Sequence, residues 1–291
     1  MIYARFFRFF QHLNWATIRK TVQRAGEKRL PGLASEMAYN AMLALFPSIL
    51  ALLTAIGLFQ PLQTTFDYLA QQLGNIAPHD ALFLIEGFVN TISLSKNRSL
   101  FSLSFILAIW TASGAISAAM TALDQINHVP PEKIRPFWKA KLVSLALTIG
   151  TILLLIAASF LVFISDLLVQ VIASQTGNLE SKVLSLWRLF TWPTALGIIA
   201  CAVGFIYRYG PSRWRKGIPI LPGAILAAIS WAILSGLFRY YVSNFGNYNA
   251  AYGTVGTFIV LMLWLNLTSL VMLFGAQLNA IVGESMQKRL K

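Results

Sequence analysis

Charged residues are scarce in this chain of 291 residues, because Asp, Glu, Lys and Arg together make up only 11% of it. A soluble domain carries about 25% charged residues and about 45–50% hydrophobic ones. Here the hydrophobic share reaches 57%. This composition excludes a disordered chain, a fibrous repeat and an ordinary soluble enzyme, and it favours an integral membrane protein.

Cysteine and histidine are also rare. Cys201 is the single cysteine, so no intramolecular disulfide and no thiolate cluster forms. His12, His79 and His128 lie far apart in the sequence, and the chain has no zinc motif and no P-loop. We therefore expect no catalytic residues, no metal, no cofactor and no enzymatic activity. The first long apolar run begins near Ala38, after a basic stretch, so no signal peptide is expected.

Six apolar runs are each long enough to cross a bilayer as a helix, which takes about 20 residues. The predicted spans are 38–58, 101–123, 142–172, 187–207, 217–242 and 254–281. All are too long and too evenly apolar to be strands of a membrane barrel. The sequence predicts an all-α integral membrane protein with one bundle of six transmembrane helices over residues 33–283. The third run exceeds a perpendicular span and is expected to tilt or to project beyond the membrane.

Basic residues predict the orientation of this bundle. Seven Lys and Arg precede the first span, four follow the second, four follow the fourth and three follow the sixth, whereas the opposite side carries five. The positive-inside rule therefore predicts that both termini are cytoplasmic. The same distribution explains the net charge of +13 as a topology signal with attraction to anionic lipid, so no nucleic-acid partner is expected.

Three of the segments outside the predicted spans have a distinctive composition. Residues 1–32 interleave Phe and Trp with Arg and Lys, which is typical of an amphipathic helix in the cytoplasmic interface. Residues 60–100 carry two apolar stripes separated by Pro78. We expect two short amphipathic helices there, which cap the exterior end of the bundle as packing or, alternatively, as a lid. Residues 284–291 form a basic cytoplasmic tail.

Polar residues within or beside the apolar runs are the candidate site, because polar groups at membrane depth are costly unless they are paired. The candidate substrate path consists of Glu36, Tyr39, Asn40, Trp110, Ser113, Ser117, Arg239, Tyr240, Tyr248, Tyr252, Asn266, Gln277 and Asn279. Structural alternatives exist. Glu36 suits a helix N-terminus at the interface, the two serines suit close helix packing, and Arg239 suits contact with outer headgroups. If an anionic ligand enters from outside, Arg239 is the residue expected to bind it.

Several short motifs, which lie in order between about residues 30 and 283, resemble one known family. They are Ala38-Tyr39-Asn40, Leu45-Phe46-Pro47, Trp110 with Ser113-Gly114, Phe137-Trp138-Lys139 with Lys141, Tyr207-Arg208-Tyr209-Gly210-Pro211, Pro222-Gly223-Ala224, Phe238-Arg239-Tyr240-Tyr241, Tyr248 with Tyr252-Gly253, and Gly275-Ala276-Gln277-Leu278-Asn279-Ala280. The ordered set resembles the YihY/virulence factor BrkB family of bacterial inner-membrane proteins. The family often has an acid where Gln277 stands, so a mechanism that needs a titrating carboxylate there is not implied for this chain.

The resemblance implies a six-helix protein of the bacterial inner membrane. Some members of the family are proposed to export siderophores or to handle envelope lipids. We therefore expect a secondary transporter, exporter or lipid translocator for an envelope-related or siderophore-like substrate, with membrane lipids and a small molecule or lipid as partners. The alternative is a non-transporting, lipid-binding protein that organises the envelope. The family's old label, ribonuclease BN, is not expected to apply, because the chain has no clustered metal-binding motif.

Overall fold

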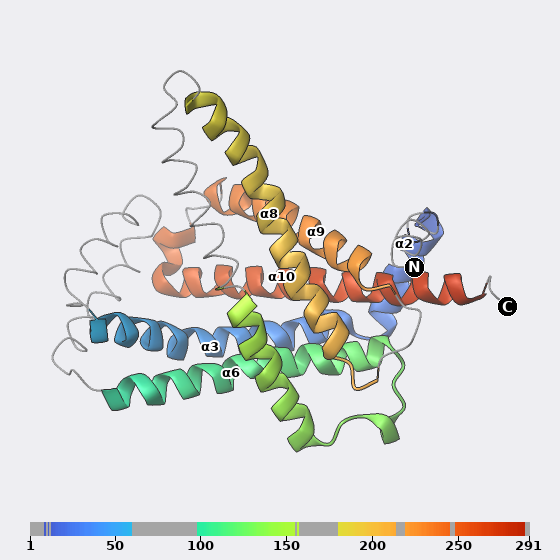
Figure 1. The fold of residues 1–291 in the computed structure, drawn as a ribbon, viewed down its shortest axis with the longest axis horizontal. Helices are drawn as coiled ribbons and strands as arrows, with labels where there is room; N and C mark the ends of the chain where they lie inside the picture. The colour runs from blue at the N-terminus through green and yellow to red at the C-terminus, as the bar shows by residue number, and fades with distance from the viewer. Residues whose placement is uncertain are drawn as a thin grey trace.

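The computed structural model describes residues 9, 11, 13–59, 98–154, 156, 180–213, 219–244 and 248–288, and these residues form helices and short connections without a strand. The elements in chain order are α2 (Trp15–Glu27), α3 (Leu30–Phe59), α6 (Arg98–Ile126), the 3-10 turn η1 (Pro131–Lys133), the helix Phe137–Leu154, α8 (Glu180–Tyr209), α9 (Leu221–Asn244) and α10 (Tyr248–Lys288) (Figure 1).

Among the residues that the structure describes, four helices are long and apolar enough to cross a membrane. They are Ser102–Ile126, Phe137–Leu154, Leu221–Val242 and Phe258–Gln287, which correspond to the second, third, fifth and sixth predicted spans. The helix α3 covers the first predicted span, and α8 covers the fourth with the shorter apolar segment Pro193–Tyr209. The prediction of an all-α chain with long apolar helices is confirmed for the described residues. The count of six spans and the orientation of the termini stay predictions.

The helices continue past the apolar runs that define the predicted spans, and the boundaries of the spans stay predictions. The helix α3 begins at Leu30 rather than at residue 38, and α10 runs from Tyr248 to Lys288 rather than from residue 254 to 281. The third predicted span begins five residues earlier, at Phe137. Arg98 to Leu100, assigned to the exterior cap, belong to α6. The rest of that cap and most of the second half of the third span lie outside the described residues.

Local sequence signals explain both ends of α2 and the C-terminal end of α6. The side chain of Asn14 caps α2 by accepting a hydrogen bond from the backbone N–H of Thr17 at 2.9 Å. Arg29 adopts a left-handed conformation with φ of 53°, which separates α2 from α3. His128 has φ of 50° just after the end of α6, and Pro130 follows it. The predicted N-terminal amphipathic helix is therefore confirmed over Trp15–Glu27.

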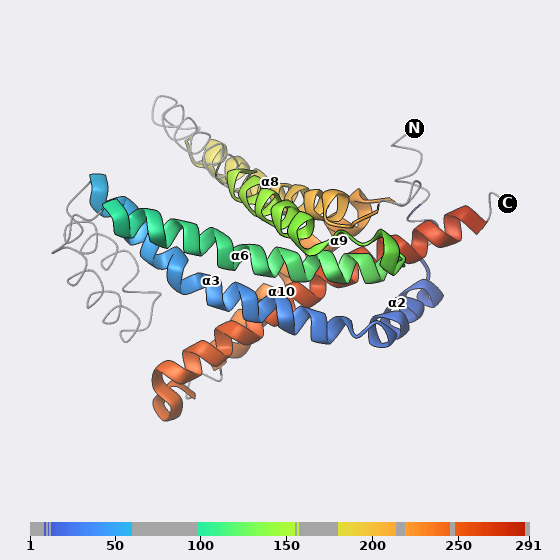
Figure 2. The ribbon, with the colours of Figure 1, turned by 90° about the horizontal axis from the view of Figure 1, so that it is seen from below.

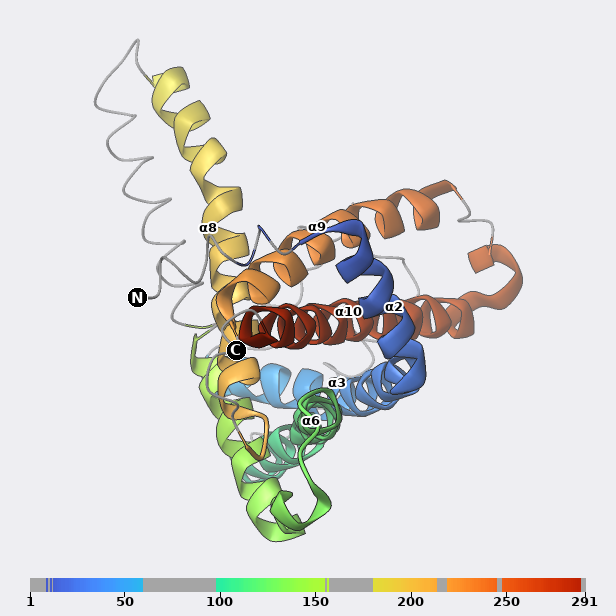
Figure 3. The same cartoon turned by 90° about the vertical axis from the view of Figure 1, so that its right-hand side faces the viewer.

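The long helices pack in pairs. Figure 2 shows α3 and α6 side by side, with α10 crossing them, and Figure 3 shows α2 lying across α10 near its C-terminal end. The core at the end of the bundle that carries α2 is rich in alanine. Ala34, Ala119, Ala122 and Ala280 are all buried there. Small side chains allow backbones in a membrane to approach closely, since packing rather than hydrophobic burial holds such helices together.

Three glycines lie at close helix contacts. The Asn40 side chain of α3 lies against Gly114 of α6, so that a Cβ at position 114 would collide with the amide. Gly275 of α10 faces the backbone carbonyl of Gly223 in α9 and the hydroxyl of Tyr207 in α8, which donates a hydrogen bond to a carbonyl of α10. These contacts bring α3 to α6, and α8 and α9 to α10.

Candidate functional site

The helix Phe137–Leu154 brings one positive charge against α6. Lys141 lies near the beginning of this helix, and its Nζ donates hydrogen bonds to Oγ of Ser113 at 2.6 Å and to the carbonyl oxygen of Trp110 at 3.2 Å. The same Nζ lies 4.2 Å from the centroid of the Trp110 ring, which is a cation–π contact. We call Trp110, Ser113 and Lys141 the Lys141 site.

The Lys141 site lies near the middle of a candidate span. Ser113 is one residue from the midpoint of Ser102–Ile126, and its side chain is fully buried. Trp110 is 16 residues before the end of α6, which is about 24 Å at 1.5 Å per residue. The hydrocarbon core of a bilayer is about 30 Å thick. The hydrogen bonds of Lys141 therefore reach a part of α6 that is expected to lie deep in the membrane.

The partners of Lys141 are uncharged. A lysine ammonium has three N–H donors and no acceptor, and here a hydroxyl, a carbonyl and a ring face take them. Among the described residues, Arg24 and Glu284 form an ion pair, and Lys141 is not part of it. An ionised residue at membrane depth without a counter-ion is costly, and such residues mark substrate or ion paths in membrane proteins.

Sequence reasoning found Trp110 and Ser113 but missed Lys141. It counted Lys141 among the basic residues outside the spans, because that residue directly precedes the apolar run that begins at Leu142. The aromatic pair Phe137 and Trp138, one turn earlier, is the signal that the helix had already begun. Ser117, also predicted, lies one turn beyond Ser113 on the same face of α6 and is half-buried.

A second group of predicted residues lies on α3. Asn40 donates from Nδ2 to the backbone carbonyl of Glu36 at 2.9 Å, so the pair on one helix face is joined through the backbone rather than through the carboxylate. Its side chain also contacts Gly114, the residue after Ser113. Glu36 and Tyr39 are exposed. The structure therefore brings Asn40 to the same level of α6 as the Lys141 site.

The predicted residues of α10 differ in their surroundings. Asn266 donates from Nδ2 to Oγ of Ser35 at 2.7 Å, which links α10 to α3. Gln277 is fully buried, and neither atom of its amide has a hydrogen-bond partner among the described residues. Asn279 accepts a hydrogen bond from the backbone N–H of Gly223 at 2.9 Å and donates to the carbonyl of Ile220 at 2.9 Å. Asn279 thereby caps the beginning of α9.

The tyrosine-rich turn between α9 and α10 is described only in part. Arg239 and Tyr240 lie near the end of α9 with exposed side chains. Tyr248 and Tyr252 lie in the first turns of α10, and their side chains are outside the described residues. The predicted role of Arg239 in binding an anion stays a prediction.

A buried carboxylate outside the predicted set joins two connections of the chain. Both oxygens of Asp124, at the end of α6, accept hydrogen bonds at 2.6 Å from Ser212, one from its N–H and one from its hydroxyl. Arg135 donates to the carbonyls of Gly210 at 2.7 Å and Pro211 at 2.9 Å. These contacts hold the chain after α8 against the end of α6. Asp124 and Ser212 are 88 residues apart, and no local pattern reveals such a pair.

Further polar contacts close the same end of the bundle. Arg24 of α2 and Glu284 of α10 form an ion pair at 2.7 Å. Lys28 donates to the carbonyl of Ile126 at 3.0 Å and lies 3.1 Å from Nε2 of His128. Within the part of the chain that the structure describes, no group of three or more His, Cys, Asp or Glu residues is placed to hold a metal ion.

Long apolar helices with close contacts at small residues define an α-helical membrane protein. The family model described as Virulence factor BrkB matches residues 21–291, and the chain belongs to this family. The resemblance predicted from the ordered motifs is confirmed.

Curated relatives agree with this assignment. The chain is 31% identical over 256 residues to the ribonuclease-like protein YfkH of Bacillus subtilis (strain 168), which covers 86% of this chain and 88% of that protein. It is 30% identical to a UPF0761 membrane protein of Janthinobacterium sp. (strain Marseille), with 94% of this chain and 61% of that longer protein covered. A UPF0761 membrane protein of Tolumonas auensis is 28% identical, with 90% and 83% covered. No solved structure matches the chain.

Proposed function

We propose that this protein is a secondary transporter, an exporter or a lipid translocator for an envelope-related or siderophore-like substrate that carries negative charge. In this proposal the protein lies in the bacterial inner membrane with both termini in the cytoplasm. It catalyses no chemical reaction and degrades no RNA, although one relative is named ribonuclease-like. The observation that carries the proposal is Lys141, whose ammonium contacts uncharged partners near the middle of α6.

The chemistry of the Lys141 site suits a transient anion. The Ser113 hydroxyl and the Trp110 carbonyl orient the ammonium, and neither of them carries a charge that balances it. A phosphate or carboxylate oxygen that replaces one of them keeps the charge-assisted hydrogen bond and adds the attraction of a full negative charge. Two unit charges 4 Å apart attract by about 4 kcal/mol at an effective dielectric constant of 20. When the anion leaves, the ammonium forms its hydrogen bonds to Ser113 and Trp110 again. Binding of the anion at this site is therefore reversible.

Asn40 extends the polar surface from α6 to α3. Its contact with Gly114 places an amide beside the helix segment that carries the Lys141 site. Ser117 adds a hydroxyl one turn further toward the end of α6. These neutral groups accept and donate hydrogen bonds without trapping a charge, as a path for a substrate requires.

A non-transporting lipid-binding role is the second candidate, and the tight packing at one end of the bundle favours it. Buried alanines, the Asp124–Ser212 hydrogen bonds and the Arg24–Glu284 ion pair close that end. A transporter has to open these contacts during its cycle, whereas an organising protein keeps them closed. A flux measurement therefore separates the two candidates.

The test uses the full chain reconstituted in liposomes. Translocation of phosphatidylglycerol labelled with the fluorophore NBD is followed by dithionite bleaching, and efflux of an anionic catecholate siderophore is followed from loaded vesicles. We expect the wild-type protein to show one of these two fluxes. That flux is expected to be at least tenfold slower in Lys141→Gln, retained in Lys141→Arg, and unchanged in Lys139→Gln, which replaces an exposed neighbour. Absence of both fluxes from the wild-type protein supports the lipid-binding candidate instead.

A further inference from the structure

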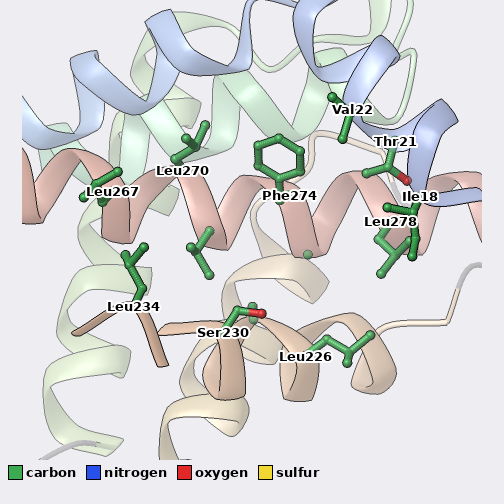
Figure 4. Close-up of a pocket in the computed structure, with 13 residues that line it drawn as sticks. Ile18, Thr21, Val22, Leu226, Ser230, Leu234, Leu267, Leu270, Phe274 and Leu278 are labelled. Atoms are coloured by element: carbon green, nitrogen blue, oxygen red, sulfur yellow. The ribbon is translucent and has the colours of Figure 1, made fainter. Parts of the chain in front are cut away.

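An apolar groove of about 380 Å³ lies between α2, α9 and α10 (Figure 4). Ile18 and Val22 of α2 form one wall, and residues of α9 such as Leu226 form another. The floor belongs to α10, where Leu270 and Phe274 point toward the groove. Thr21 and Ser230 contribute the only hydroxyl groups among the lining residues.

The amphipathic helix α2 contributes apolar side chains to the groove and carries exposed basic residues on its other faces. Trp15, Ile18 and Val22 lie on one face of α2 and are 78%, 42% and 57% exposed. Ile18 and Val22 belong to both this stripe and the groove. Arg19 and Lys20, which follow Ile18 directly, are exposed. An apolar stripe bordered by cations is the pattern of a helix that lies on a membrane with anionic lipids.

The length of the groove matches one leaflet of a bilayer. Along α10 it extends from Leu267 to Leu278, which rise about 17 Å at 1.5 Å per residue. This is about half of the hydrocarbon core, which is about 30 Å thick.

The lining of the groove suits a hydrocarbon chain. Apart from Thr21 and Ser230, its lining side chains are apolar. A hydrocarbon chain that enters the groove therefore leaves no polar group of its own unpaired.

We propose that this groove binds an acyl chain of an anionic phospholipid from the leaflet beside α2, with the headgroup attracted by the exposed basic residues Arg19 and Lys20 of that helix. Lipid tails are as apolar as the leucines of the groove, so the groove alone gives little preference among lipids. Preference arises from the basic residues of α2, since each basic residue near an anionic headgroup favours it by about fivefold. The proposal is independent of transport and holds for both candidate functions.

The first test needs no variant. The full chain is placed in phosphatidylcholine nanodiscs with a trace of phosphatidylglycerol or phosphatidylcholine that carries a diazirine in its acyl chain. After illumination, mass spectrometry locates the attached lipid on peptides. We expect the phosphatidylglycerol probe to label groove residues of α2, α9 and α10 several-fold more than the phosphatidylcholine probe does. Equal labelling by both probes, or labelling spread evenly over the outer face of α9, overturns the proposal.

Two pairs of variants distinguish the role of the groove from the role of the basic residues of α2. Ser230→Phe fills the groove, and its control is Ile233→Phe on the same helix, at a position that is 59% exposed and outside the groove. We expect at least a fivefold loss of labelling only in the first. The double variant Arg19→Gln and Lys20→Gln is expected to abolish the preference for phosphatidylglycerol, whereas Lys133→Gln keeps it. Cross-links that join two copies of the chain through the groove contradict a lipid occupant.

Discussion

Removing the Asp124 carboxylate is expected to destabilise the protein strongly, although this residue lies far from the Lys141 site along α6. Asp124 is 7% exposed, and its two oxygens accept hydrogen bonds from the backbone N–H and the hydroxyl of Ser212. The Ser212 hydroxyl also accepts a hydrogen bond from the backbone N–H of Arg135. The replacement Asp124→Ala leaves the Ser212 N–H without its acceptor.

The magnitude follows from the number and kind of these bonds. A hydrogen bond to a charged group contributes about 1.5–3 kcal/mol to stability. The two bonds share one side chain, so their full contributions do not add. We therefore take the lower bound of about 1.5 kcal/mol for each bond, which gives a loss of about 3 kcal/mol in Asp124→Ala. The variant Asp124→Asn keeps one oxygen acceptor but loses the charge, and a loss of about 1.5 kcal/mol is expected.

The assay is denaturant unfolding in detergent micelles, followed by tryptophan fluorescence. Gln125→Ala is the control, because Gln125 is the exposed neighbour of Asp124 on the same helix turn. The expected order of stability is wild type and control, then Asp124→Asn, then Asp124→Ala. If Asp124→Ala unfolds within about 0.5 kcal/mol of the wild type, the hydrogen bonds to Ser212 do not hold this connection.

Two further substitutions and one double-mutant cycle test polar groups of α10 and a partner on α2 in the same unfolding assay. Asn279→Ala leaves the buried N–H of Gly223 without an acceptor, so we expect a loss of about 2 kcal/mol, and wild-type stability refutes this cap. Gln277→Met removes a buried amide without partners and is expected to be neutral or stabilising by about 1 kcal/mol, whereas a clear loss indicates an unseen partner. A double-mutant cycle on Arg24 and Glu284 should give a coupling of about 0.5–1 kcal/mol that falls with added salt; no coupling contradicts the ion pair.

The class of fold follows from the sequence because apolar length is a strong signal. A run such as Leu221–Val242 has too few polar groups to be stable in any form except a membrane helix. The helix ends were harder to predict. Glu36 and Arg98 are polar but are compatible with a helix, so α3 and α6 extend beyond the apolar residues that defined the spans.

The candidate site was predictable where a polar residue interrupts an apolar run. Ser113 and Asn40 are such residues, and the structure places them on neighbouring helices at one level. Lys141 was missed because a cation at the edge of an apolar run looks the same in sequence as a topology signal. Asp124 and Ser212 were missed because their contact depends on how α6 and α8 end beside each other. Periodicity reports a helix face but not the residue that lies opposite it.

The central claim is that water and anions reach the Lys141 face of α6 inside the membrane. In a Cys201→Ala background, Trp110→Cys and Phe105→Cys make a matched pair, because both native side chains are 49% exposed. They lie five residues apart and about 140° apart around the helix. Glu132→Cys, at an exposed position in η1, controls for reagent delivery.

The decisive measurement is labelling of these single cysteines by a membrane-impermeant thiol reagent in right-side-out and inverted vesicles. The account predicts that Trp110→Cys reacts and that Phe105→Cys is protected by lipid. Reaction of Trp110→Cys from both sides indicates alternating access. Protection of both positions, while Glu132→Cys reacts normally, contradicts a water-filled path at Lys141.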